Sequence, residues 1–156
     1  MGMYCSIRAL SPAQLEQLDL AEDVAAAHER SGPSAHLEKS WHGLHYLLTG
    51  SAMAGDMPLA FLLLGGEPAG EDADEGPRFI QPEEVRQINT ALSPISTEQL
   101  WSRFDPARME EEGVYPGIWD EPEDDLREEY VGYFQELKRV VAQAAAAGQG
   151  LLVDIG

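Results

Sequence analysis

The chain has 156 residues, 44% of them hydrophobic, and its 28 acidic against 10 basic side chains give a net charge of −18. It is too apolar for a disordered chain, and no apolar run approaches the roughly 20 residues of a membrane span. Because so acidic a surface repels phosphate groups, binding to nucleic acid or to a membrane surface is not expected. The length suits one domain, residues 1–156, and the single cysteine and the lack of a signal peptide predict a cytoplasmic protein.

The N-terminal residues predict a strand followed by a helix. Apolar and polar side chains alternate over residues 3–9, the two-residue period of a half-buried strand. Ser11 and Gln14 have the spacing of a capping box, and Pro12 between them suits the first helical position. A helix is therefore expected from about Pro12, and the alanine-rich residues 21–30 are expected to continue helically after a break.

Residues 35–50 are predicted to form one amphipathic helix ended by Thr49 and Gly50. At 100° per residue, His45 lies on the shoulder of the apolar stripe, and His42 is rotated further toward solvent. The stripe itself consists of Leu37, Trp41, Leu44 and Leu48.

Short elements are predicted for the middle of the chain. Residues 58–66 read as a short buried helix, with a strand as the alternative, and residues 66–77 as an exposed, mobile loop rich in glycine, proline and acids. A short strand is expected at residues 78–80 and a helix over residues 82–92. A second capping box begins a short helix over residues 96–104 that buries Leu100, Trp101 and Phe104.

The C-terminal part predicts a long helix and a closing strand. The helix is expected over residues 122–147, with its acids at the start and its basic residues late, as the helix dipole favours. The alternation of Leu151, Val153 and Ile155 predicts a strand that pairs with the N-terminal one. The predicted fold class is α+β, with several helices packed on a small sheet that includes both terminal strands.

Three short motifs occur in order along the chain: an MGM start, W-x-x-L-H with L-x-T-G over residues 41–50, and YPG at residues 115–117. Their combination resembles the YfbM-like family of bacterial proteins, a domain of unknown function, over nearly the whole chain. The resemblance implies a small α+β protein of the bacterial cytoplasm and assigns it no chemistry. His42 and the acidic insertion at residues 67–76 depart from the family pattern, so neither is a good candidate for a shared role.

The two histidines at positions 42 and 45 have a metal-ligand spacing on a helix. No H-E-x-x-H motif, second histidine pair or paired cysteine accompanies them, so no metal is predicted. His45 beside Trp41 either lines a pocket and acts as an acid or base, or packs in the core as a hydrogen-bonded residue. Phosphate-binding loops and dinucleotide fingerprints are absent from the sequence, so no cofactor is predicted.

An aromatic loop and an acidic segment are the remaining candidates. Tyr115 and Trp119 lie in an irregular stretch over residues 114–119, where aromatic side chains either contact a ligand or fill the core beneath the loop. Around this loop, residues 105–129 hold eleven acids and two arginines, a net charge of −9 that is half of the total. Such a segment attracts a cationic ligand or a basic protein in a salt-sensitive way.

Two functions follow from these features. The leading interpretation is a binding module that recognises a basic protein or a cationic small molecule, for example as an inhibitor of a cationic toxin or enzyme. Its candidate ligand-binding residues are Trp41, His45, Tyr115 and Trp119. The alternative is a small enzyme in which His45 and a nearby carboxylate carry out acid/base catalysis. The sequence does not give the oligomeric state.

Overall fold

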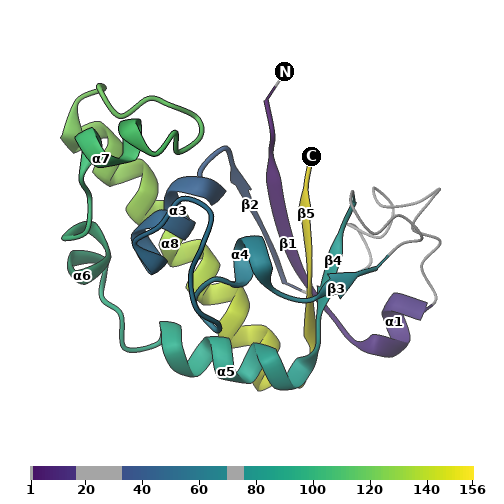
Figure 1. Cartoon of the computed structure of the whole chain (residues 1–156). Helices are drawn as coiled ribbons and strands as arrows, with labels where there is room; N and C mark the ends of the chain where they lie inside the picture. Colours follow the sequence, from purple (N-terminus) through teal and green to yellow (C-terminus); the bar gives the residue numbers. More distant parts are fainter. Residues whose placement is uncertain (1, 17–32, 70–75) are drawn as a thin grey trace.

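A computed structural model describes residues 2–16, 33–69 and 76–156, and these form an α+β fold in which helices pack on an antiparallel sheet (Figure 1). The sheet has five strands in the order β2-β1-β5-β4-β3. Their bounds are Cys5–Leu10 for β1, Ser34–Glu38 for β2, Glu67–Pro68 for β3, Arg78–Ile80 for β4 and Gly150–Ile155 for β5. The predicted fold class is confirmed.

The described residues include seven helices, and none of these is long and apolar enough to cross a membrane. Figure 1 shows α3, α6 and α8 on one side of the sheet and α1 on the other. The bounds of the helices are Pro12–Glu16 for α1, Trp41–Thr49 for α3, Phe61–Leu64 for α4, Pro82–Leu92 for α5, Thr97–Trp101 for α6, Pro106–Glu111 for α7 and Glu123–Ala146 for α8.

The two terminal strands lie side by side in the middle of the sheet. β1 pairs with β5 along its whole length, from Cys5 opposite Ile155 to Leu10 opposite Gly150, which confirms the predicted pairing. Because side chains alternate across a strand, Ile7 and Ala9 point toward the main core and Arg8 points to the opposite face. The sheet therefore has an inner face, against α5 and α8, and an outer face.

The long helix α8 supplies much of the inner layer. It has the predicted position and begins with Glu123, Asp124 and Asp125, whose charges suit the positive end of the helix dipole. One stripe of α8 is fully buried and packs on α5, β1 and β2. The stripe consists of Leu126, Tyr130, Phe134, Leu137, Val140, Val141 and Ala144.

Hydrogen bonds at the helix starts follow the sequence signals. Ser11 Oγ accepts from the Gln14 amide at 3.1 Å, while Gln14 Oε1 accepts from the Ser11 amide at 2.8 Å. The same reciprocal pair joins Ser96 and Gln99 at the start of α6. Both predicted capping boxes are confirmed. The helix expected at residues 21–30 lies outside the described residues.

The prediction of one helix over residues 35–50 is wrong in its first part. Residues 34–38 form β2, and Leu37 belongs to this strand because Ala35 and Leu37 are buried while the side chains between and after them are exposed. The helix begins only at Trp41. Leu37 and Trp41 are four residues apart, which is also the spacing of an apolar stripe on a helix, but residues 34–38 pair with β1 and are therefore a strand.

The loop predicted for residues 66–77 also contains regular structure. Glu67 and Pro68 form the edge strand β3, paired antiparallel with β4 through Glu67 opposite Phe79 and Pro68 opposite Arg78. Proline is tolerated there because an edge strand needs hydrogen bonds on one side only. The short strand predicted at residues 78–80 is confirmed as β4, and the buried helix predicted in residues 58–66 is confirmed as α4.

Candidate functional site

The three family-like motifs meet at one end of the fold. The Trp41 ring stacks on Tyr115 with 5.7 Å between centroids, and Trp41 Nε1 donates a hydrogen bond to the Met3 carbonyl at 2.9 Å. The Met3 amide in turn donates to the Tyr115 hydroxyl at 2.8 Å. The N-terminal motif, helix α3 and the YPG loop are therefore joined by direct contacts. Two of the candidate binding residues, Trp41 and Tyr115, lie together.

His42 is buried, contrary to the expectation that it points to solvent. Its Nδ1 accepts a hydrogen bond from the Tyr115 amide at 2.9 Å, and its Nε2 donates to the Ala52 carbonyl at 2.7 Å. The loops that bring Tyr115 and Ala52 over the helix cannot be read from a helical projection of α3 alone. Both ring nitrogens of His42 are used, and no group of three or more His, Cys, Asp or Glu side chains in the described ranges is placed to hold a metal ion.

His45 lies on the same helix and is wholly enclosed, with 0% of its surface exposed. Nε2 donates to the Ala54 carbonyl at 2.8 Å, while Nδ1 has no hydrogen-bond partner among the described residues. Burial lowers the pKa of the imidazole and outweighs the opposing effect of the Ala54 hydrogen bond, while the neighbouring His42 lowers it slightly further, so the ring is neutral at neutral pH. An enclosed neutral ring gives the acid/base alternative no geometric support.

Trp119 is placed apart from the Trp41 and Tyr115 pair. Its indole Nε1 donates to the Val114 carbonyl at 2.8 Å, and its ring lies 5.6 Å from that of Tyr130. Only 3% of the residue is exposed, yet it lines a hollow of about 460 Å³ at the surface. The other residues of this hollow, which we call the α7 hollow, are Pro106, Ala107, Glu110, Gly117 and Asp120.

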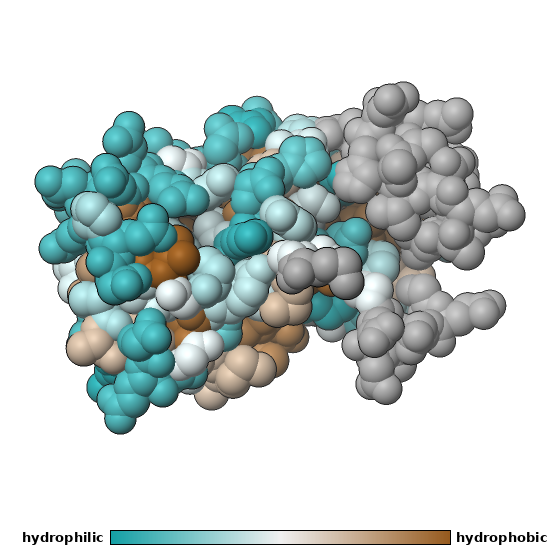
Figure 2. Space-filling view, turned by 90° about the horizontal axis from the view of Figure 1, so that it is seen from above, coloured by the Kyte–Doolittle hydropathy of each residue, from teal (hydrophilic) through white to brown (hydrophobic). Residues whose placement is uncertain are grey.

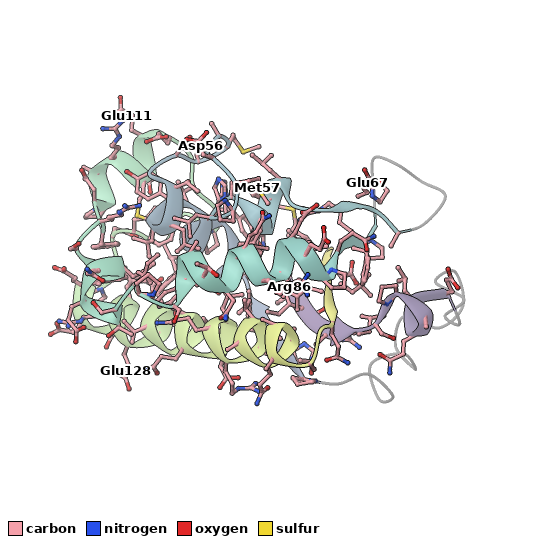
Figure 3. The ribbon with its side chains drawn as sticks, turned by 90° about the horizontal axis from the view of Figure 1, so that it is seen from below. Asp56, Met57, Glu67, Arg86, Glu111 and Glu128 are labelled. Atoms are coloured by element: carbon pink, nitrogen blue, oxygen red, sulfur yellow. The ribbon has the colours of Figure 1, made fainter. Side chains whose placement is uncertain are left out.

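Acidic side chains surround the α7 hollow. A second depression, of about 660 Å³, is lined by residues of α7 and its ends: Asp105, Ala107, Arg108, Glu111 and Glu112. Figure 2 shows hydrophilic side chains over this end of the molecule, and Figure 3 shows Glu111 and Glu128 projecting outward from it. Among these residues Arg108 is held by Glu112, with 3.0 Å between Nε and Oε2. We call residues 105–129 the acidic face.

The sequence interpretation missed a polar group on the outer face of the sheet. Ser6 in β1 stands opposite His36 in β2 and Asp154 in β5, so the three residues form one row across three strands. Arg8 occupies the next row. The alternation in residues 3–9 placed Arg8 on the polar side of the strand, but it gave no sign that Arg8 itself is buried.

Comparisons with known proteins agree with the fold. The sequence profile of the family described as "Domain of unknown function (DUF1877)" matches residues 1–153. Among solved structures, the chain is similar to a protein of unknown function, YfbM from Escherichia coli, with a TM-score of 0.73, 18% identity and coverage of 98% of this chain and 99% of that one. At this identity the likeness shows a shared fold. No curated protein matches the chain. The resemblance to YfbM-like proteins is confirmed.

Proposed function

We propose that this chain, a member of the DUF1877 family, is a cytoplasmic binding module for a basic protein. The description of the family assigns no function, so the proposal is argued from the site itself. The α7 hollow is the proposed point of contact. The observation that carries the proposal is that two acidic residues, Glu110 and Asp120, line the same hollow as Trp119.

This arrangement suits the end of an arginine or lysine side chain. Carboxylates accept charge-assisted hydrogen bonds from a guanidinium or ammonium group, and an indole adds a cation–π attraction. Trp119 is already fixed by its bond to Val114, so its ring needs no ordering when a ligand arrives. A cationic side chain entering the hollow therefore meets preorganised partners.

The acidic face supports the same proposal at longer range. Its net charge of −9 attracts a positively charged partner and raises the association rate. Rim charges of this kind act mainly on association and are screened by salt.

The experiment measures binding of an oligoarginine peptide to the intact chain and to the double variant E110Q/D120N. We expect the double variant to bind more weakly by about two- to fivefold, the equivalent of roughly 0.5–1 kcal/mol for exposed charge pairs. Raising the salt from about 0.1 M to 1 M, which shortens the screening length from roughly 10 to 3 Å, should weaken binding further.

The matched control is E83Q/E84Q, which removes the same charge from the first turn of α5. Its affinity should stay close to that of the unchanged chain. An equal loss of affinity in both double variants would show that only the net charge matters, and it would refute the α7 hollow as the contact. Affinity that does not change with salt would refute the electrostatic basis of the proposal.

A further inference from the structure

The peptide group between Val114 and Tyr115 connects His42 to the α7 hollow. Its N–H donates to His42 Nδ1 at 2.9 Å, and its carbonyl accepts from the indole Nε1 of Trp119 at 2.8 Å. The same carbonyl accepts from the Gly117 amide at 3.1 Å. Because a peptide group is planar, its N–H and C=O cannot turn independently. The orientation that His42 gives to the N–H therefore also sets the carbonyl that holds Trp119 and Gly117, two residues of the hollow.

The hydrogen bonds of His42 fix its protonation state from both sides. A backbone N–H can only donate, so Nδ1 opposite the Tyr115 amide carries no proton. A carbonyl only accepts from an N–H, so Nε2 opposite Ala52 carries the proton. The ring is therefore neutral in this arrangement, and a second proton would place an imidazolium N–H against the N–H of Tyr115. The bond between α3 and the YPG loop is thus expected to be lost as the pH falls.

The surroundings of His42 direct the effect of a proton to this one peptide group. His42 is 6% exposed, and its ring stacks on that of Trp41 with 5.2 Å between centroids, so packing holds it in place. The Tyr115 ring is held separately, by stacking on Trp41 and by the hydrogen bond that its hydroxyl accepts from Met3. Protonation should therefore rotate the peptide group of residues 114–115 and leave the loop attached through the Tyr115 side chain.

Other ionisable groups lie on the segments around α3, but their classes change charge in other ranges of pH. Carboxyl groups ordinarily titrate at about pH 4 and phenols at about pH 10, and arginine stays charged throughout. Burial lowers the pKa of His45, the other imidazole of α3, so His45 takes up a proton only at lower pH. The remaining groups are Tyr46 on α3, Asp56 in the loop after it, Arg103 after α6, Arg108 and Glu112 at α7, and Tyr130 on α8.

We propose that His42 is the positioning residue of the α7 hollow and makes binding there sensitive to acid. Its neutral ring holds the 114–115 peptide group in the orientation that fixes Trp119 for a cationic side chain, and protonation of the ring releases both. This regulation rests on the proposed function, because it acts on the same hollow.

Hydrogen exchange measured by NMR tests the connection without any ligand. Between about pH 7.5 and 5.5, where histidine changes charge, the protection factors of the Tyr115 amide and the Trp119 indole proton should fall by about tenfold, the value of one hydrogen bond. The Val114 amide, which donates to the Met109 carbonyl at 2.9 Å, is the internal control and should keep its protection. Unchanged protection of the Tyr115 amide would overturn the proposal.

Binding of the oligoarginine peptide tests the consequence for the hollow. The unchanged chain should bind about two- to fivefold more weakly at the lower pH, which corresponds to the loss of an exposed cation–π contact. H42N places an amide oxygen near the position of Nδ1, where it accepts from the Tyr115 amide and does not titrate. Its affinity should therefore be the same at both pH values.

Two further variants separate the roles of the ring. H42Q moves the amide outward, level with Nε2, and leaves the Tyr115 amide without an acceptor, so binding should be weak at both pH values. H36N makes the same change as H42N at an exposed histidine of β2, and it should keep the pH dependence of the unchanged chain.

The outcomes distinguish this inference from the proposed function. A pH dependence that persists in H42N, or an H42Q variant that binds as tightly as the unchanged chain at neutral pH, would refute the role of His42 while leaving the hollow as the contact. If the peptide binds at neither pH, the proposed function fails. The exchange of the Tyr115 amide then still decides whether His42 controls the loop.

Discussion

The two faces of one sheet are built in different ways, although the same strands contribute to both. On the inner face, Ile7, Ala9 and Val153 join the main core under α5 and α8. The charged residue opposite Val153, Arg78, donates hydrogen bonds to backbone carbonyls of α4 and its C-cap. On the outer face, Ser6 and Arg8 occupy the intervening positions. The inner face thus serves stability by close packing and satisfied hydrogen bonds, whereas the outer face keeps a buried arginine in the same row as Leu152 of a small apolar cluster.

The inner face should give the largest loss of stability. Phe134 in α8 is fully buried in the main core, so F134A removes a large apolar side chain and leaves a cavity. We expect the free energy of unfolding to fall by about 3–5 kcal/mol. Urea denaturation followed by circular dichroism measures it. A loss below about 1 kcal/mol would show that the inner layer is loosely packed.

A matched pair of glycines sharpens the same point. A Cβ at Gly43 in α3 would lie 2.6 Å from the Tyr130 ring and 2.9 Å from that of Trp119, so G43A should destabilise the chain by about 1–3 kcal/mol despite its better helix propensity. At Gly132 in α8 a Cβ meets nothing within 4 Å, and G132A should stabilise by up to about 1 kcal/mol. Thermal melting measures both effects: the melting temperature should fall in G43A and rise in G132A.

The outer face should respond in the other direction. R8M exchanges a buried guanidinium whose Nη atoms have no hydrogen-bond partner among the described residues for an apolar side chain of similar size, and we expect a gain of about 1–2 kcal/mol. Urea titration at low salt gives the value. A marked loss of stability would mean that Arg8 is a structural group after all, and the contrast between the two faces would disappear.

His45 should give the smallest effect, visible as a dependence on pH. Its pKa is lowered in the folded state, so the unfolded chain takes up the proton first as the pH falls. The contribution is complete above the ordinary value of about 6.5 and is lost as the pH falls from there toward the folded pKa, with a slope of at most about 1.4 kcal/mol per unit. H45Q should flatten the stability curve between about pH 7 and 5 relative to the unchanged chain; parallel curves would contradict this assignment.

The local signals in the sequence predicted most of the fold. Capping boxes at Ser11 and Ser96 and the long amphipathic pattern of α8 are encoded within a few residues, and they appear where expected. β2 was missed because Leu37 fits a helical stripe as well as an alternating strand, and only its partner β1 distinguishes the two.

The candidate site was less predictable because it depends on contacts between distant segments. The stacking of Trp41 on Tyr115 joins residues of α3 and the YPG loop, and the enclosure of His42 and His45 depends on loops that no helical projection includes. Tyr115 and Trp119 are close in sequence, yet the Tyr115 ring stacks on Trp41 of α3 and the Trp119 ring lies against Tyr130 of α8. Arg8 could be placed on a face of its strand but not recognised as buried.

The central position of β5 has a consequence for how the chain acquires its structure. Residues 5–10 must find residues 150–155 across most of the sequence, and β4 also needs β5 as its neighbour. Contacts between residues so distant in sequence form slowly, because the chain between them loses conformational entropy before the strands gain any hydrogen bonds. During synthesis, the pair β1–β2 and the pair β3–β4 therefore each keep an unpaired strand edge until β5 has been synthesised. Unpaired edges can associate with other chains, so aggregation or chaperone binding is expected mainly in this interval.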